Sequence, residues 1–239
     1  MQTQFTMHSV DFSNQVKGRL VPATVWLPKG LSEPRPLILV GHGGSGHKKS
    51  NLVLDIAKAL VENFGLVVAA IDGPVHGDRR KEFADGPVVR AEFRDLWTNG
   101  SSVDPMVEDW ITTIDYLCRM PEVNSNAIGW YGISMGTSYG IPVVAADQRI
   151  KCAALGMWGT TRLPIDRLIK DAKDIHVPVL FQIKTGDEIF NSEGQTELFN
   201  FIASQNKKLV SYPGGHTDPA GEQLKDIVEF LVSYLLPSK

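Results

Sequence analysis

The sequence predicts an α/β fold, a mainly parallel sheet of about eight strands with an antiparallel N-terminal edge and helices on both faces. From residue 37 onward, short apolar runs alternate with segments of helical periodicity, a rhythm typical of parallel strands joined by helices. The apolar runs are continuous, as expected of strands covered on both faces. The length of 239 residues suits one large domain, so we expect a single domain over residues 1–239.

The N-terminal segment differs from the rest, because its apolar and polar residues alternate. Residues 4–13 and 20–27 each show the alternation of a half-exposed strand, and Lys17-Gly18 between them favours a turn. Together they predict an antiparallel hairpin at the edge of the sheet. Residues 31–36 contain two prolines and are expected to form a loop.

The remaining elements follow from hydrophobic periodicity and cap signals. Six further strands are predicted over residues 37–40, 66–71, 127–131, 152–156, 179–184 and 208–212. Helices are predicted over residues 51–63, from Asp104, over 135–146, 163–174 and 194–204, and after Asp218. Asp104-Pro105 and Asp218-Pro219 both have the pattern of an N-cap followed by proline at the first helical position. Pro142 is expected to kink its helix.

Two segments interrupt this alternation at one end of the predicted sheet. Residues 73–103 are rich in glycine and in charges of both signs, and we expect a long irregular excursion, since loops of this length are usually functional or mobile. Residues 157–174 form a second, shorter excursion over the same edge. Arg79, Arg80 and Lys81 alternate with nearby acidic residues and are interpreted as a solvated face.

Composition excludes several classes of function. The net charge is −3 and the pI about 6.1, so no nucleic-acid partner is expected. No apolar run approaches the ~18 residues of a membrane span, and residues 1–13 lack the apolar core of a secretory signal. We therefore expect a cytoplasmic protein without a membrane partner; its oligomeric state is not indicated. Cys118 and Cys152 lie in apolar segments and are expected to be buried thiols.

The stretch Gly132-Ile133-Ser134-Met135-Gly136 is a G-x-S-x-G pentapeptide between a predicted strand and a predicted helix. If Ser134 lies on a sharp strand-to-helix turn, the two glycines press against neighbouring backbone, where a Cβ would clash. The serine is then exposed at a helix N-terminus, where the helix dipole favours negative charge. The alternative is a glycine-rich turn with an idle serine.

Three residues that follow predicted strands support a nucleophilic role for that serine. Ligands of parallel sheets bind beyond the carboxyl ends of the strands, where Ser134, Asp187 and His216 all fall. A serine hydroxyl needs a base, here His216, and the imidazole needs a carboxylate, here Asp187, to fix its tautomer. Attack on a carbonyl creates an oxyanion, for which the N–H groups of Met135 and Gly44 are the candidate donors.

Rival residues lie near two of these candidates. Glu188 adjoins Asp187, and Asp187 itself could be only a turn residue at the end of a strand. Asp218 is close to His216 in the sequence, but the Asp-Pro pair favours a helix cap.

Other side chains at this edge have competing interpretations. His42 is expected to brace the oxyanion loop through hydrogen bonds. Trp158, Phe190 and His76 are candidate substrate contacts, although the two aromatic residues could equally belong to the core and His76 could be structural. A metal site from His42, His47 and His76 lacks nearby cysteine or carboxylate spacing, so neither metal nor cofactor is predicted.

These motifs, in this order, resemble those of α/β-hydrolases, and within them the compact dienelactone-hydrolase and prolyl-oligopeptidase-like esterases. The matching stretches are His42-Gly43-Gly44, residues 72–79, the pentapeptide around Ser134, residues 178–189, and Pro213-Gly214-Gly215-His216. The resemblance extends from about residue 20 to the C-terminus. It implies an α/β-hydrolase fold and a serine hydrolase that cleaves small carboxylic esters through an acyl-enzyme, without a cofactor.

The chain departs from the family pattern in three respects. Lys184 occupies a position where these families often have glycine. The nucleophile is Ser134, whereas dienelactone hydrolases proper use cysteine, so lactone specificity is not implied. No large cap domain is present. Peptidase or amidase action, thioesterase action and a non-catalytic binding role on the same fold remain alternatives.

Overall fold

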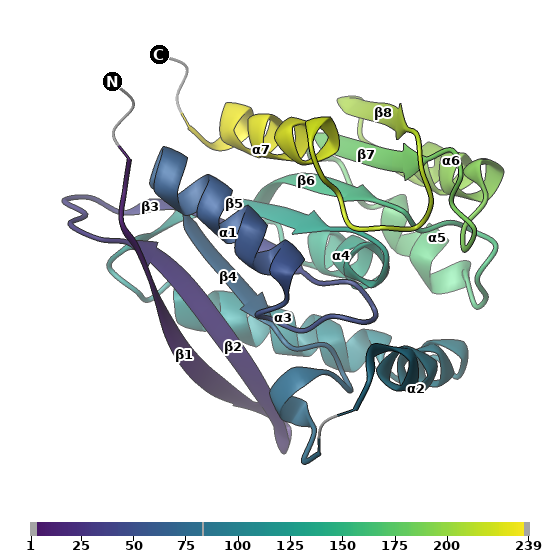
Figure 1. Cartoon of the computed structure of the whole chain (residues 1–239), viewed down its shortest axis with the longest axis horizontal. Helices are drawn as coiled ribbons and strands as arrows, with labels where there is room; N and C mark the ends of the chain where they lie inside the picture. The colour runs from purple at the N-terminus through teal and green to yellow at the C-terminus, as the bar shows by residue number, and fades with distance from the viewer. Residues whose placement is uncertain (1–3, 83, 237–239) are drawn as a thin grey trace.

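The computed structural model describes residues 4–82 and 84–236, and its eight strands form one sheet (Figure 1). The strands are β1 (Met7–Val16), β2 (Arg19–Pro28), β3 (Arg35–Gly41), β4 (Val67–Ile71), β5 (Val123–Gly132), β6 (Ile150–Gly156), β7 (Val179–Lys184) and β8 (Lys207–Tyr212). Their order across the sheet is β1-β2-β4-β3-β5-β6-β7-β8. β2 is antiparallel to both of its neighbours, and all other adjacent pairs are parallel. The predicted architecture is confirmed.

Helices cover both faces of the sheet. They are α1 (Asn51–Phe64), α2 (Gly86–Thr98), α3 (Val103–Leu117), α4 (Met135–Ala146), α5 (Asp166–Ala172), α6 (Ser192–Phe201) and α7 (Glu222–Leu235). α1 and α7 contact each other and pack on one face, and α2 to α6 belong to the apolar cluster of the other face (Figure 1). Neighbouring residues of a strand therefore pack on opposite faces of the sheet. Trp130 packs on the face covered by α3 and α4, and Tyr131 on the face covered by α1 and α7.

The strand order opens a crevice at the centre of the sheet. After β3 the chain crosses to β4 on one side, and β5 then pairs with β3 on the other side, with Gly41 opposite Gly132. At such a switch point the connections leave in opposite directions, so the carboxyl ends of the two strands border an open site. The loops after β3 and β5 carry Gly44 and Ser134 to this crevice.

The excursion over residues 73–103 is more regular than the sequence predicts. It contains a short 3-10 turn, Gly77–Arg79, and the 13-residue helix α2. α2 buries Val89, Phe93 and Trp97, which recur every four residues on one side of the helix. Charged residues between them obscure this narrow apolar stripe, and for that reason the segment resembles a loop in the sequence.

Two predicted helix starts are wrong by a few residues. α3 begins at Val103 with Ser102 as its N-cap, so Asp104 lies inside the first turn. α7 begins at Glu222 after Gly221, and Asp218 is therefore not its cap. In both places an Asp-Pro pair lies near the helix end without occupying the cap position, which is set by where the main chain turns. α4 continues through Pro142 to Ala146.

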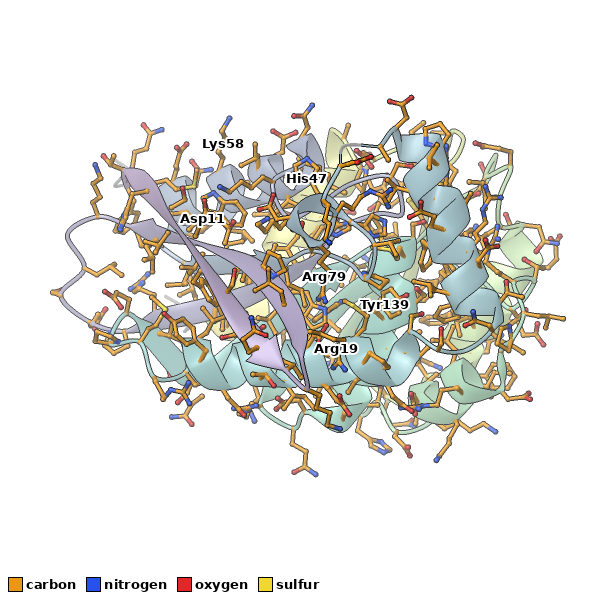
Figure 2. The ribbon with its side chains drawn as sticks, turned by 90° about the horizontal axis from the view of Figure 1, so that it is seen from below. Asp11, Arg19, His47, Lys58, Arg79 and Tyr139 are labelled. Carbon is orange, nitrogen blue, oxygen red and sulfur yellow. The ribbon has the colours of Figure 1, made fainter. Side chains whose placement is uncertain are left out.

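The interpretation of Arg79 as a solvated residue is also wrong. Its side chain is only 8% exposed, and it donates hydrogen bonds to the Asp72 carbonyl at 3.0 Å and to Asp109 Oδ2 at 2.7 Å. Asp109 is itself buried and binds Arg19 from the other side, at 2.9 Å. Figure 2 shows the molecule from below, with Arg19 and Arg79 labelled. The paired charges join the start of the excursion to α3 and β2.

Candidate active site

Ser134 occupies a strained turn between β5 and α4. Its backbone has φ 53° and ψ −122°, a combination that non-glycine residues rarely adopt. A Cβ on Gly136 would lie 2.2 Å from the Gly41 carbonyl oxygen, and one on Gly132 would lie 2.5 Å from the Gly136 oxygen. The predicted reason for the two glycines is thus confirmed, because neither position has room for a side chain.

Thr137 fastens this turn to β6, a role that sequence reasoning missed. Its Oγ1 lies 2.6 Å from the Gly156 carbonyl oxygen and 2.8 Å from that of Gly132, and it accepts the Gly156 N–H at 2.8 Å. The Ser134 N–H also donates to the Gly156 oxygen, at 2.9 Å. A buried hydroxyl in the first turn of α4 thereby fixes the path of the serine turn. The only sequence signal was a threonine directly after the pentapeptide.

The structure brings the three predicted residues Ser134, His216 and Asp187 into contact. His216 Nε2 lies 2.9 Å from Ser134 Oγ, and His216 Nδ1 lies 2.8 Å from Asp187 Oδ2. A carboxylate can only accept, so the proton is on Nδ1. Nε2 is then free to accept the serine hydroxyl proton. This is the tautomer that a general base requires.

Asp187 is oriented by its own surroundings. Its side chain is fully buried, and its Oδ1 accepts the N–H groups of Ile189 and Phe190, both at 2.9 Å. Burial by itself raises the pKa of the Asp187 carboxyl, but the hydrogen bonds from His216 and the two amides outweigh it and hold the pKa below its ordinary value. The rival Glu188 binds the main-chain N–H of His216, at 2.8 Å, and not the ring.

The candidate oxyanion donors lie on either side of the serine. Met135 begins α4 directly after Ser134. Gly44 lies on the loop after β3 and, like Ser134, borders the cavity described below. Within residues 4–82 and 84–236, neither the Met135 N–H nor the Gly44 N–H donates to a protein acceptor. Both N–H groups are therefore available to a bound oxygen.

Two buried histidines support the loop that carries Gly44. The Gly73 N–H donates to His42 Nε2 at 2.9 Å, while His42 Nδ1 lies 2.8 Å from the Gly43 oxygen. His76 Nε2 lies 3.1 Å from the Gly44 oxygen. Burial lowers the pKa of His42 to about 4, and burial together with the neighbouring His42 lowers that of His76 to about 3. The two rings are neutral braces.

A cavity of about 670 Å³ opens in front of Ser134. Trp158 and Phe190, two of the candidate substrate contacts, line it and are at the same time almost fully buried, with exposed fractions of 2% and 1%. Phe93 of α2 extends this aromatic wall. His76 does not border the cavity, because its ring is buried and turned toward Gly44. The aromatic residues thus belong to the hydrophobic core and also form a wall of the cavity.

Three arginines also border the cavity. Arg90 and Arg94 come from α2, and Arg162 from the loop after β6. The Arg162 guanidinium lies over the rings of Trp158 and Phe190, and burial and the charge of Arg94 lower its pKa. Over the described part of the chain, none of the three makes a salt bridge with a carboxylate. The cavity lining thus contains three arginines, which sequence reasoning missed, beside the carboxylates Glu188 and Asp218.

Other expectations concern metals, thiols and membranes. Among the described residues, no three His, Cys, Asp or Glu side chains are placed to hold a metal ion. Cys118 and Cys152 are free thiols; the second is buried and the first partly so. In the same ranges no helix combines the length and the hydropathy needed to cross a membrane.

Comparison with known proteins places this geometry in context. The profile of the dienelactone hydrolase family matches residues 21–217. An uncharacterised protein of Pseudomonas aeruginosa is 29% identical over 156 residues, which are 64% of this chain and only 38% of that protein. The matched stretch thus spans less than half the length of this relative.

Solved structures resemble the chain over nearly its whole length. A cold-adapted esterase from an Arctic intertidal metagenomic library is 33% identical with a TM-score of 0.85, over 96% of this chain and 94% of that one. A dienelactone hydrolase-like promiscuous phosphotriesterase from metagenomic libraries has a TM-score of 0.75 at 14% identity, over 95% and 98%. An acetyl xylan esterase from Paenibacillus has a TM-score of 0.68 at 17% identity, over 96% and 90%. The last two show likeness of fold alone.

Proposed function

The chain belongs to the dienelactone hydrolase family of α/β-hydrolases, and from that premise we propose that it is a serine esterase cleaving small carboxylic esters. The observation that supports this most strongly is the continuous hydrogen-bonded arrangement from Ser134 through His216 to Asp187. Structural relatives called esterases favour the same reaction class. A non-catalytic role is less well supported, since such proteins have no need of an imidazole held between a strained serine and a buried carboxylate.

In the proposed mechanism, Ser134 Oγ attacks the ester carbonyl while His216 Nε2 takes its proton. Asp187 stabilises the imidazolium that results, and the N–H groups of Met135 and Gly44 bind the oxyanion of the tetrahedral intermediate. Collapse of the intermediate breaks the ester C–O bond, and His216 returns the proton to the departing alcohol. Water then attacks the acyl-serine by the same steps in reverse and releases the acid.

The cavity indicates which esters fit. An aromatic wall of Trp158, Phe190 and Phe93 suits an apolar acyl or alcohol group. Glu188 and Asp218 also border the cavity, but Arg94 and Arg162 have no carboxylate partner among the described residues and favour substrates that carry a negative charge away from the ester bond. We therefore expect small esters with one apolar and one anionic end to be cleaved faster than neutral esters of equal length.

Turnover of p-nitrophenyl acetate and butyrate tests the proposal. Ser134→Ala is expected to lower the rate by at least about 10³-fold while the circular dichroism spectrum stays unchanged. Unchanged turnover would remove Ser134 from the mechanism. Matched anilide and thioester substrates separate esterase from amidase and thioesterase action, and p-nitrophenyl hemisuccinate set against the butyrate ester tests the charge preference.

A further inference from the structure

Lys184, which occupies a position where the family often has glycine, lies against the loop that carries His216. It ends β7, is 6% exposed, and its ammonium lies 2.7 Å from the Thr217 carbonyl oxygen and 2.6 Å from Thr217 Oγ1. Over the described residues it makes no salt bridge with a carboxylate. Burial lowers the pKa of this amine. Burying a charge without a direct counter-ion is costly, and the two hydrogen bonds to Thr217 offset part of this cost. The placement of a lysine here therefore requires an explanation.

The main-chain contacts between β7 and this loop stop just before the histidine. The Thr185 N–H donates to the Tyr212 oxygen at 2.9 Å, and the Gly186 N–H donates to the Gly214 oxygen at 3.0 Å. Beyond Gly214, which has φ +108°, side chains replace the main-chain ladder. A segment with two consecutive glycines ahead of His216 has little conformational preference of its own.

Glu188 and Lys184 hold the loop at His216 itself and at the residue that follows it. Glu188 Oε2 accepts the N–H of His216 at 2.8 Å, and Lys184 binds the next residue, Thr217. Both side chains come from the segment at the end of β7 that also supplies Asp187. The base and the carboxylate that orients it are therefore positioned from one piece of chain.

We propose that Lys184 is a positioning residue that, together with Glu188, fixes His216 in register between Ser134 and Asp187. The inference rests on the proposed function, because the register matters only if His216 transfers a proton. A hydrogen-bonded base tolerates little displacement, and a shift of about 1 Å can cost on the order of 10²-fold in rate. Glu188 and Thr217 border the cavity, but Lys184 does not, so loss of the lysine tether lowers kcat and leaves KM unchanged.

The first test compares Lys184→Met with Lys207→Met. Lys207 on β8 also donates to main-chain oxygens, those of Ile202 at 2.6 Å and Phe199 at 3.0 Å, but lies away from the site. We expect Lys184→Met to lower kcat 10- to 100-fold with KM within twofold of the native value, and Lys207→Met to leave both within twofold. Equal kcat in the two variants would overturn the proposal.

A second pair of variants tests Glu188 and does not depend on folding of the lysine variant. Glu188→Gln keeps an oxygen that can accept the His216 N–H, so kcat stays near the native value, whereas Glu188→Ala loses the acceptor and lowers kcat about 10-fold. Equal effects of both substitutions would show that Glu188 acts through its charge and would contradict the tether.

A spectroscopic measurement separates positioning from stability. The proton shared by His216 Nδ1 and Asp187 gives a far-downfield ¹H resonance, which should broaden in Lys184→Met and persist in Lys207→Met. If native protein shows no turnover or Ser134→Ala is as active as native protein, the proposed function itself fails. If native protein is active and Lys184→Met retains both its kcat and the sharp resonance, only the tether fails.

Discussion

The serine turn and helix α2 border the same cavity, yet they are held in place very differently. Around Ser134 the main chain of three strands lies in direct contact, with Gly136 pressed on Gly41 and Thr137 bonded to Gly156. α2 contacts the core through one stripe of three side chains. In the helix that follows the serine, α4, all but the last two residues are buried.

This difference separates chemistry from substrate choice. Of the groups proposed to make and break bonds, Ser134 and Asp187 lie just after the ends of β5 and β7, and His216 lies on the loop after β8. Arg94 and Phe93, proposed to select the substrate together with Arg162 of the loop after β6, are on α2, whose outer face is free to change without disturbing the sheet. Substitutions in the serine turn should therefore cost more stability than comparable substitutions in α2.

Gly136→Ala should be the most damaging change. Its new Cβ would overlap the Gly41 carbonyl, which belongs to β3 and has no room to retreat, so we expect a loss of more than about 4 kcal/mol or failure to fold. Gly43→Ala is the control, since a Cβ there meets nothing within 4 Å. Urea unfolding measures both, and similar midpoints would show that the serine turn is less crowded than described.

Low pH should reduce the stability of the fold through His42 and His76, which support the oxyanion loop between the two regions. Their pKa values, about 4 and about 3 when folded against 6.5 in the unfolded chain, mean that the unfolded chain binds more protons in this window. Stability is therefore full above pH 6.5 and falls as the pH drops, by roughly 2 kcal/mol per histidine between pH 7 and pH 5.

Denaturant unfolding across pH 5 to 7 checks this slope. His76→Gln keeps a donor for the Gly44 oxygen and cannot titrate, so it should remove about half of the dependence. A native protein whose stability is flat over this range would contradict the assignment of neutral, buried rings.

Thr137→Val should cost about 2–3 kcal/mol, because it removes a hydroxyl and leaves the main-chain groups of Gly156 buried with fewer partners. Thr137→Ser keeps the hydroxyl and serves as the control. Thermal unfolding of the two variants should differ clearly. If the valine variant were as stable as the serine variant, the hydroxyl would not be what fastens the turn to β6.

The smallest effects are expected when a valine is replaced by threonine, once in α4 and once in α2. Val143→Thr in α4 introduces a hydroxyl at a fully buried position and should destabilise by about 1–2 kcal/mol. Val88→Thr in α2, at a position 49% exposed, should change stability by less than about 0.5 kcal/mol. Similar losses in both would mean that α2 is packed as tightly as α4.

The same contrast explains what could be predicted from the sequence. The strands and the serine turn follow from local signals, namely alternating or continuous apolar runs and glycines where backbones touch. The meeting of Ser134, Asp187 and His216 follows from the place of each residue after a parallel strand. α2 was missed because its apolar stripe is narrow, and Arg79 because its partner Asp109 lies 30 residues away. The roles of Thr137 and Lys184 depend on main-chain groups of other elements. A threonine after the pentapeptide and a lysine in place of the family's glycine mark the two positions but do not indicate which groups they bind.

Covalent labelling with a fluorophosphonate tests whether Ser134 is a nucleophile activated by His216. We expect one adduct per chain, located by peptide mass spectrometry on Ser134, with labelling at least about 10³-fold slower in His216→Ala. An adduct on another residue, or equal labelling rates in native protein and His216→Ala, would contradict it.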